Sequence, residues 1–252
     1  MLKALFFDMD ETLCDTDYAN RMAKQLFAGA LRDLLGGNFD ADHVANEYVR
    51  SIYREWQADE QSRYMPIIQT SGERAFRVQL IADLAQRYSG ADLSEASATW
   101  LLEKFDSDRL QHFDFYPGIK EFLIDARQYF TTVVITNGPE HSQLPKLATV
   151  QMEDYVDFII VGGQEPAQKP AVSIFEKALG LAGCEAHEAI HVGDSLAADI
   201  QGAHNSKITS VWIQHQQPLD AELGINPQHT LLHPSEIPAL IRQLSGDVFT
   251  RV

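Results

Sequence analysis

Short, mostly apolar segments recur along the chain at intervals that predict a parallel β-sheet. Each is four or five residues long, which is typical of strands buried on both faces. Helix-length segments such as 118–129, 172–181 and 196–204 lie between the later ones, as in βαβ units. The pattern predicts an α/β fold with a three-layer, Rossmann-like parallel sheet. The expected strands are 4–7, 132–135, 158–161, 189–192 and 209–213.

The interval 16–112 breaks this alternation, because apolar residues recur there at helical spacing. We expect an inserted all-helical domain at 16–112, with 1–15 and 113–252 forming the α/β core. Polar residues dominate 57–72, which predicts a loop between the second and third helices. The expected buried stripes are Tyr18, Met22, Leu26, Ala30 and Leu34; Val44, Tyr48, Ile52 and Trp56; Phe76, Leu80, Leu84 and Tyr88; and Leu101, Leu102 and Phe105.

Composition narrows the class of protein. The 252 residues are 45% hydrophobic, which is enough for a substantial core. The net charge of -16 argues against a nucleic-acid partner, because that affinity rests on clustered Lys and Arg. Cys14 and Cys184 are too few for a disulfide framework, and no apolar run at the N-terminus is long enough for a membrane span. We expect a cytoplasmic protein without membrane partners; the sequence does not predict its oligomeric state.

Two aspartates follow the first expected strand. Asp8 and Asp10 are two positions apart, so their side chains can share a face where the strand ends. In open α/β sheets the ligand crevice lies at these carboxyl ends. Burying two neighbouring carboxylates is unfavourable unless they are neutralised, for example by a divalent cation. The alternative is that an aspartate caps a turn, which we prefer for Asp15 and Asp17.

Two later segments add groups that can bind an anion. Thr136 and Asn137 end the second expected strand, where a hydroxyl, an amide side chain and backbone N–H groups could receive phosphate oxygens. Lys169 precedes Pro170 at the start of an expected helix, beside the positive end of its dipole. A lysine is unfavourable there unless an anion is nearby, although an isolated lysine is more commonly a solvated surface residue.

A third aspartate follows the fourth expected strand. In the segment AIHVGDSLAADI, Asp194 stands at the carboxyl end of a strand, so three carboxylates could converge with those of Asp8 and Asp10. Oxygen ligands of this kind suit Mg²⁺, which binds few carboxylates and shares substrate phosphate oxygens. Asp199 is explained equally well by the dipole of the helix that it begins. His191 lies inside the strand and is predicted to be a core residue.

These residues occur in a fixed order that resembles the haloacid dehalogenase superfamily of phosphohydrolases, subfamily I, whose C1-type helical cap would match the insertion. The resemblance covers essentially the whole chain. Its one departure is Glu11, where many relatives have Gly, Asp or Asn. The matching residues are the DxDxT motif Asp8, Asp10 and Thr12, then Thr136, Lys169, Gly193-Asp194 and Asp199.

The resemblance implies the roles of these residues. Asp8 would attack phosphorus and become an aspartyl phosphate, while Asp10 would protonate the leaving oxygen and later deprotonate water. The pKa of Asp10 must suit both roles, and raising it needs desolvation or negative charge nearby. The other implied roles are Mg²⁺ binding by Asp8, the backbone carbonyl of Asp10 and Asp194; phosphoryl binding by Thr136, Asn137 and Lys169; and support from Thr12 and Asp199.

The implied activity is hydrolysis of a small phosphorylated metabolite, such as a nucleoside monophosphate or a sugar phosphate, including acylneuraminate phosphates. Asp10 disfavours dehalogenation, since an alkyl halide needs no leaving-group proton. A phosphotransferase of the sugar-phosphate mutase type shares every core residue and remains the nearer alternative; a receiver-like domain or a non-catalytic phosphate-binding module are further ones. Cap residues that could contact the substrate are Arg63, Arg74 and Arg77, and His141 is expected on a loop near the site.

Overall fold

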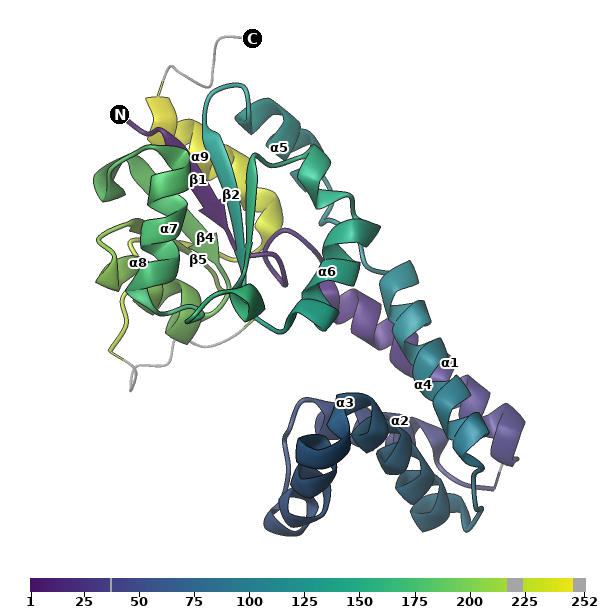
Figure 1. The fold of residues 1–252 in the computed structure, drawn as a ribbon. Coiled ribbons are helices and arrows are strands. Elements are labelled where there is room, and N and C mark those ends of the chain that lie inside the picture. The colour runs from purple at the N-terminus through teal and green to yellow at the C-terminus, as the bar shows by residue number, and fades with distance from the viewer. Residues whose placement is uncertain (37, 217–223, 247–252) are drawn as a thin grey trace. The chain divides into compact units, whose positions relative to one another are not determined.

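The computed structural model describes residues 1–36, 38–216 and 224–246, and the chain divides into two compact units (Figure 1). Met1–Thr16 and Phe113–Val252 form the first, which we call the α/β unit. Asp17–His112 forms the second, which we call the helical unit. Each unit has its own buried apolar cluster, as expected of a separate folding domain.

The α/β unit is built on a parallel sheet with the strand order β3-β2-β1-β4-β5-β6. The five strands expected from the apolar segments are confirmed. The sixth was not predicted, because its side chains are exposed or only partly buried at the edge of the sheet and it therefore has no apolar run. The strands are β1 (Ala4–Phe7), β2 (Thr131–Thr136), β3 (Phe158–Val161), β4 (Ala189–Gly193), β5 (Thr209–Ile213) and β6 (His229–Leu231).

Helices cover both faces of this sheet. They are α5 (Ile119–Ala126), α6 (Glu140–Thr149), α7 (Val172–Ala182), α8 (Gln201–Asn205), which a π-helical turn at Leu196–Ile200 precedes, and α9 (Ile237–Ser245). Successive strand residues point to opposite faces, so Phe6 packs in a cluster with residues of α7 and α8. Phe7 instead meets Phe122 of α5, with ring centroids 6.0 Å apart. The predicted three-layer, Rossmann-like α/β fold is confirmed.

The described residues of the helical unit form four helices that enclose an aromatic core. They are α1 (Thr16–Leu35), α2 (Ala41–Ile52), α3 (Ala58–Ser89) and α4 (Glu95–Gln111). Phe27 of α1 stacks on Tyr48 of α2 with centroids 4.7 Å apart, and both rings contact Phe105 of α4. These contacts join three helices through one buried group of rings.

The predicted stripe on α1 is wrong by about one residue. Tyr18, Leu26 and Leu34 are exposed, whereas Phe27 and Leu31 are buried. The true core face also contains small alanines, including Ala19, Ala23 and Ala28, which let neighbouring helices approach closely. Large apolar residues alone therefore predict a face of α1 that lies about one residue away from the face that is buried.

The predicted loop at 57–72 is also wrong, because α3 already begins at Ala58. Gln57 and Glu60 form a capping box that satisfies backbone N–H groups at this helix start. Tyr64 is buried against Trp56 and Phe76, while the polar residues around it face solvent. The polar composition reflects an exposed helix face; the break comes only at Gly72, whose φ of 85° is non-helical.

None of the helices within the described ranges is both long enough and apolar enough to cross a membrane.

Candidate active site

The predicted site residues of the α/β unit gather at the carboxyl ends of its central strands. Asp8 follows β1, Thr136 ends β2, and Asp194 follows β4. Because β2 and β4 lie on opposite sides of β1, the chain changes direction across the sheet at this point. Such a switch point opens the crevice in which α/β proteins bind ligands.

Three carboxylates meet in this crevice. Asp8, Asp194 and Asp199 each place one oxygen within 4.8 Å of the others. Asp199 fits there because Gly193 has no side chain: a Cβ at that position would lie 2.2 Å from Cγ of Asp199. The glycine at the end of β4 is therefore required for the packing of the acidic group.

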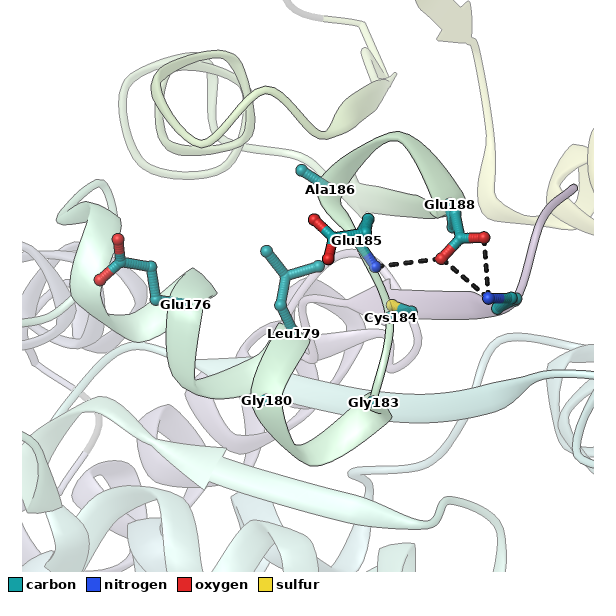
Figure 2. A pocket seen from close by; sticks show the side chains of 9 residues that line it. Glu176, Leu179, Gly180, Gly183, Cys184, Glu185, Ala186 and Glu188 are labelled. Atoms are coloured by element: carbon teal, nitrogen blue, oxygen red, sulfur yellow. Dashed lines mark hydrogen bonds and ion pairs between the residues drawn. The ribbon is translucent and has the colours of Figure 1, made fainter.

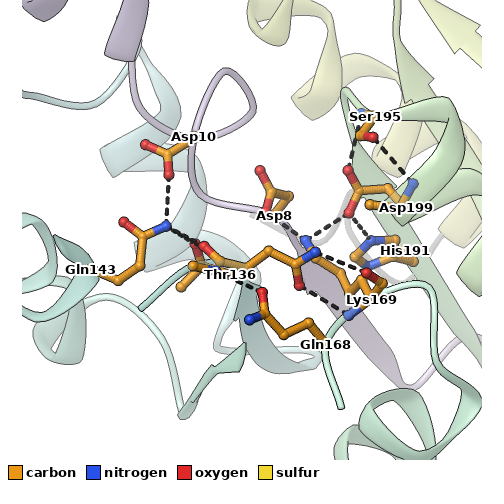
Figure 3. A network of polar contacts seen from close by, with 12 residues as sticks. Asp8, Asp10, Thr136, Gln143, Gln168, Lys169, His191, Ser195 and Asp199 are labelled. Atoms are coloured by element: carbon orange, nitrogen blue, oxygen red, sulfur yellow. Dashed lines mark hydrogen bonds and ion pairs between the residues drawn. The ribbon is translucent and has the colours of Figure 1, made fainter. Parts of the chain in front are cut away.

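Lys169 lies between two of these carboxylates, those of Asp8 and Asp199 (Figure 3). Its Nζ donates to Oδ1 of Asp8 at 2.5 Å and to Oδ1 of Asp199 at 2.7 Å. The residue is only 5% exposed, so the alternative of a solvated surface lysine is wrong. Burial lowers the pKa of Lys169, but the carboxylates of Asp199 and Asp8 outweigh it and raise the pKa above its ordinary value. The ammonium is therefore held in its charged form.

Asp199 is fully occupied by protein donors. Oδ1 accepts from Lys169 and lies 2.9 Å from Nε2 of His191, and Oδ2 accepts from the backbone N–H of Ser195 at 3.0 Å. Burial raises the pKa of Asp199, but Lys169 and His191 more than offset it, and the net pKa is lowered. An ionised carboxylate can only accept, so Nε2 of His191 carries the proton of this bond. His191 is buried as predicted, but it also fixes Asp199.

Asp8 and Asp194 each have a carboxylate oxygen that accepts no hydrogen bond from the described residues. Burial, then the neighbouring carboxylates, raise the pKa of both above the ordinary value for aspartate. Among the residues that the structure describes, Asp194 accepts no side-chain hydrogen bond, and Lys169 is the only ammonium for three carboxylates. An excess of negative charge on hard oxygen ligands suits a divalent cation such as Mg²⁺.

Asp10 lies in a different environment from Asp8. Its Oδ1 accepts from Nζ of Lys146 at 2.8 Å and from Oγ1 of Thr16 at 2.5 Å, and its Oδ2 accepts from Nε2 of Gln143 at 2.9 Å. Burial raises the pKa of Asp10, but the charge and hydrogen bond of Lys146 outweigh it and lower the pKa overall. The pKa of Asp10 is therefore not raised in this arrangement, because Lys146 lies beside the carboxylate although it is far along the chain.

Thr136 and Asn137 contribute differently from what was expected. Oγ1 of Thr136 faces the site and accepts from Gln143 at 2.9 Å. The Asn137 side chain instead binds the backbone of Lys169 twice, with Nδ2 donating to the carbonyl at 2.9 Å and Oδ1 accepting from the N–H at 3.0 Å. Its amide therefore anchors the Lys169 segment and is not free to receive phosphate. Thr12 is buried, and its Oγ1 has no hydrogen-bond partner among the described residues.

The arginines proposed for substrate contact are paired inside the helical unit. Arg63 binds Asp83, Arg74 binds Glu103, and Arg77 binds Asp106. His141 is exposed in the first turn of α6, so the expectation that it lies on a loop is wrong.

Figure 2 shows a pocket whose lining includes Lys3 and Glu188, the residues that directly precede β1 and β4, so it lies at the amino ends of these strands. Lys3 in this pocket forms an ion pair with Glu188 at 2.8 Å. Burial raises the pKa of the Cys184 thiol, which disfavours the reactive thiolate. Cys184 is partly exposed, whereas Cys14 is buried. The chemistry described above belongs to the carboxyl edge.

Gln143, Lys146 and Gln168 belong to the polar network and were missed in the sequence. Gln168 accepts from the backbone N–H of Gly138 at 2.9 Å and so ties the loop that follows Thr136 to the loop that carries Lys169. Gln143 and Lys146 stand three positions apart on α6, and therefore on one helix face. That spacing, on the helix that follows Thr136, was the available signal.

Comparisons with known proteins agree with this geometry. Residues 2–207 match the family model of the haloacid dehalogenase-like hydrolases. The chain is 27% identical to N-acylneuraminate-9-phosphatase from Rattus norvegicus over 249 residues, covering 98% of this chain and 96% of the relative. It is 26% identical to glyceraldehyde 3-phosphate phosphatase from Pyrococcus abyssi over 217 residues, covering 85% and 82%. The solved HAD-hydrolase YfnB from Bacillus subtilis, bound to magnesium, has the same fold, with a TM-score of 0.65 at 18% identity, covering 95% of this chain and 98% of that chain.

Proposed function

The chain belongs to the haloacid dehalogenase-like hydrolase family, and from this premise we propose that it is a magnesium-dependent phosphatase of small phosphorylated metabolites. The observation that carries the proposal is the position of Asp8. Its carboxylate is held by Lys169 at the switch point of the sheet, beside Asp194 and within reach of Asp10. A nucleophile, a phosphate-binding cation and an acid/base group are thereby placed around one crevice.

The metal site would consist of Asp8, Asp194 and the backbone carbonyl of Asp10. This donor set fits Mg²⁺ because the side chains of Asp8 and Asp194 are not neutralised in full by Lys169. When bound, Mg²⁺ would supply Lewis-acid charge that lets an anionic phosphate approach an anionic carboxylate. The oxygens of Asp199 already bind Lys169, His191 and the backbone of Ser195. Asp199 would therefore support the site without binding the metal.

In the first half-reaction a carboxylate oxygen of Asp8 forms a bond to phosphorus as the bond from phosphorus to the ester oxygen breaks. The leaving oxygen takes the proton of Asp10 and departs as an alcohol. Lys169, Thr136 and the backbone N–H groups around Asn137 hold the phosphoryl oxygens. Because Asp10 is ionised beside Lys146, it takes up its proton as the substrate enters; the negative charge of the phosphate disfavours its ionised form.

In the second half-reaction water attacks phosphorus and the bond to Asp8 breaks. Asp10 accepts the proton of that water and releases it to solvent as inorganic phosphate leaves, so both aspartates return to the states they had before the substrate entered. Thr12 would support the turn that carries the two aspartates. The covalent route replaces one difficult displacement between two anions with two easier steps.

The substrate would be a nucleoside monophosphate or a sugar phosphate, with the inserted helical domain predicted at 16–112 acting as a cap that selects it. The two relatives named above act on different phosphorylated compounds, although both are 26–27% identical to this chain. The family relationship therefore supports the reaction class more strongly than any one substrate. We place the protein in the cytoplasm, where such metabolites occur.

A panel of phosphorylated metabolites, incubated with and without Mg²⁺, tests the proposal. We expect inorganic phosphate to be released from one or a few members, and EDTA to stop its release. Transfer of phosphoryl groups to added sugar phosphates, without free phosphate, would instead indicate a mutase. If the panel and p-nitrophenyl phosphate all stay intact with Mg²⁺ present, the chain is a binding module and the proposal is wrong.

A further inference from the structure

Two side chains of α6 converge on the carboxylate of Asp10. Gln143 and Lys146 are 4% and 6% exposed, and each contributes one buried donor. The Gln143 amide binds Oδ2, and the Lys146 ammonium binds Oδ1. Because the donors meet different oxygens of the same carboxylate, they define the plane of that group as well as its position.

The burial of Lys146 needs an explanation within this site. Desolvating an ammonium is costly, and buried lysines are uncommon unless they are paired. Among the described residues, Asp10 is the only hydrogen-bond acceptor of Lys146, whose ammonium otherwise lies 5.6 Å from the centre of the Phe113 ring. The sheet edge thus assigns one buried lysine to each aspartate of the motif: Lys169 to Asp8 and Lys146 to Asp10.

Gln143 also links the two halves of the site. Its Nε2 lies 2.9 Å from Oγ1 of Thr136 and contacts the backbone carbonyl of Asn137, in addition to Oδ2 of Asp10 (Figure 3). An amide has two N–H groups, so these three acceptors compete for it. The side chain therefore couples the orientation of Asp10 to the segment proposed to hold the phosphoryl group.

We propose that Lys146 and Gln143 are positioning residues that hold the carboxylate of Asp10 toward the leaving oxygen of the substrate. This inference rests on the proposed phosphatase function and goes beyond it, because neither residue belongs to the motifs that indicated that function. Their effect falls on both proton transfers of Asp10, and it depends on the leaving group only in the step in which Asp10 gives up its proton as the ester bond breaks. Proton transfer depends steeply on such alignment, whereas binding of the phosphoryl group does not.

Two aryl esters of nearly equal shape isolate this effect. Phenol is a weaker acid than p-nitrophenol, so phenyl phosphate needs a proton on its leaving oxygen more than p-nitrophenyl phosphate does. We expect Lys146→Met to lower kcat about 100-fold on phenyl phosphate and no more than about 10-fold on p-nitrophenyl phosphate. KM should stay within about threefold on both esters. Gln143→Met should act in the same direction with about a 10-fold loss on phenyl phosphate.

Lys177→Met is the matched control, because it removes the same charge from an exposed position on α7 of the same unit. It should leave both esters unaffected. Thermal melts show whether each variant is folded; should Lys146→Met fail to fold, the milder Gln143→Met and the charge-conserving Lys146→Arg decide the question. Lys146→Arg should recover at least part of kcat on phenyl phosphate.

Three outcomes overturn the inference. Equal losses of kcat on the two esters would indicate a merely structural role, an increase confined to KM would indicate substrate binding, and unchanged kinetics would indicate no role. Each of these requires an active wild-type enzyme, so each leaves the phosphatase function intact. A wild type that is inactive on both esters would instead overturn the proposed function and this inference with it.

Discussion

The candidate site of the α/β unit and the helical unit differ in how their charged side chains are paired. In the α/β unit, Asp8, Asp194 and Asp199 crowd around the single ammonium of Lys169. In the helical unit acidic residues pair with basic ones, as Glu60 does with Arg50 and Asp106 with Arg77. The pKa of Asp194 is raised by burial and by other carboxylates, whereas the hydrogen bond from Arg50 lowers that of Glu60.

The difference separates groups that stabilise the fold from groups that are retained at a cost. A paired carboxylate adds to the free energy of unfolding, or is neutral. Buried carboxylates that repel one another reduce it, and they persist where a ligand or a reaction uses them. The excess of negative charge, more than any single motif, distinguishes the candidate site from the rest of the molecule.

The largest effect is expected from Asp8→Asn. The variant cannot form the aspartyl phosphate, so release of inorganic phosphate should fall at least about 1,000-fold. The free energy of unfolding should change little, because the lost bond to Lys169 is offset by weaker repulsion from Asp194 and Asp199. Urea unfolding and phosphate assays measure the two quantities. Asp125→Asn, at an exposed position of α5, is the matched control, and retained turnover in purified Asp8→Asn would reject the nucleophile.

Asp10→Asn should have the next largest effect. The amide can neither give a proton to the leaving oxygen nor accept one from water, so both half-reactions should slow by about 100-fold or more. Rapid-quench measurements resolve formation and breakdown of the aspartyl phosphate separately. Unchanged rates for both steps would exclude the acid/base role. A change in only one step would restrict Asp10 to that step.

In the helical unit, Glu60→Gln should reduce stability in a pH-dependent way. The folded-state pKa of Glu60 lies below 4.5, its ordinary value, so the pair with Arg50 is fully effective above pH 4.5 and is lost as the pH falls through the lowered pKa. At pH 7 the variant should be less stable by about 1–2 kcal/mol. This difference should shrink toward pH 3.

Urea unfolding followed by tryptophan fluorescence measures this difference, since Trp56 and Trp100 both lie in the helical unit. Arg50→Met should show the same dependence on pH. A stability difference that stays constant between pH 7 and pH 3 would contradict the assigned pairing.

The smallest effect is expected from Arg74→Met. The ion pair of Arg74 with Glu103 has both side chains 59% exposed, and such pairs contribute less than about 1 kcal/mol. If this pair is the only role of Arg74, KM for the substrate found in the metabolite panel should stay within about twofold of the wild-type value. A larger increase in KM would restore Arg74 as a substrate contact and show that charge pairing in the helical unit serves binding as well.

The arrangement of the α/β unit was largely predictable from short-range patterns. The strands that end before Asp8 and Asp194 are buried on both faces, so each is an apolar run of a recognisable length. Chain direction in a parallel sheet then brings their carboxyl ends to one edge without further information. The helical unit was harder to predict, since alanines on the core face of α1 and the exposed first half of α3 weaken the apolar stripe.

The sequence by itself determined the α/β fold class, the order of the motif residues and the edge of the sheet at which they meet, because these follow from local periodicity and chain direction. Only the tertiary structure decided which charges neutralise one another. Lys146 reaches Asp10 across 136 positions, and Asn137 turns its amide to the backbone of Lys169 across 32. Such pairings depend on distances in space, and local sequence does not record them.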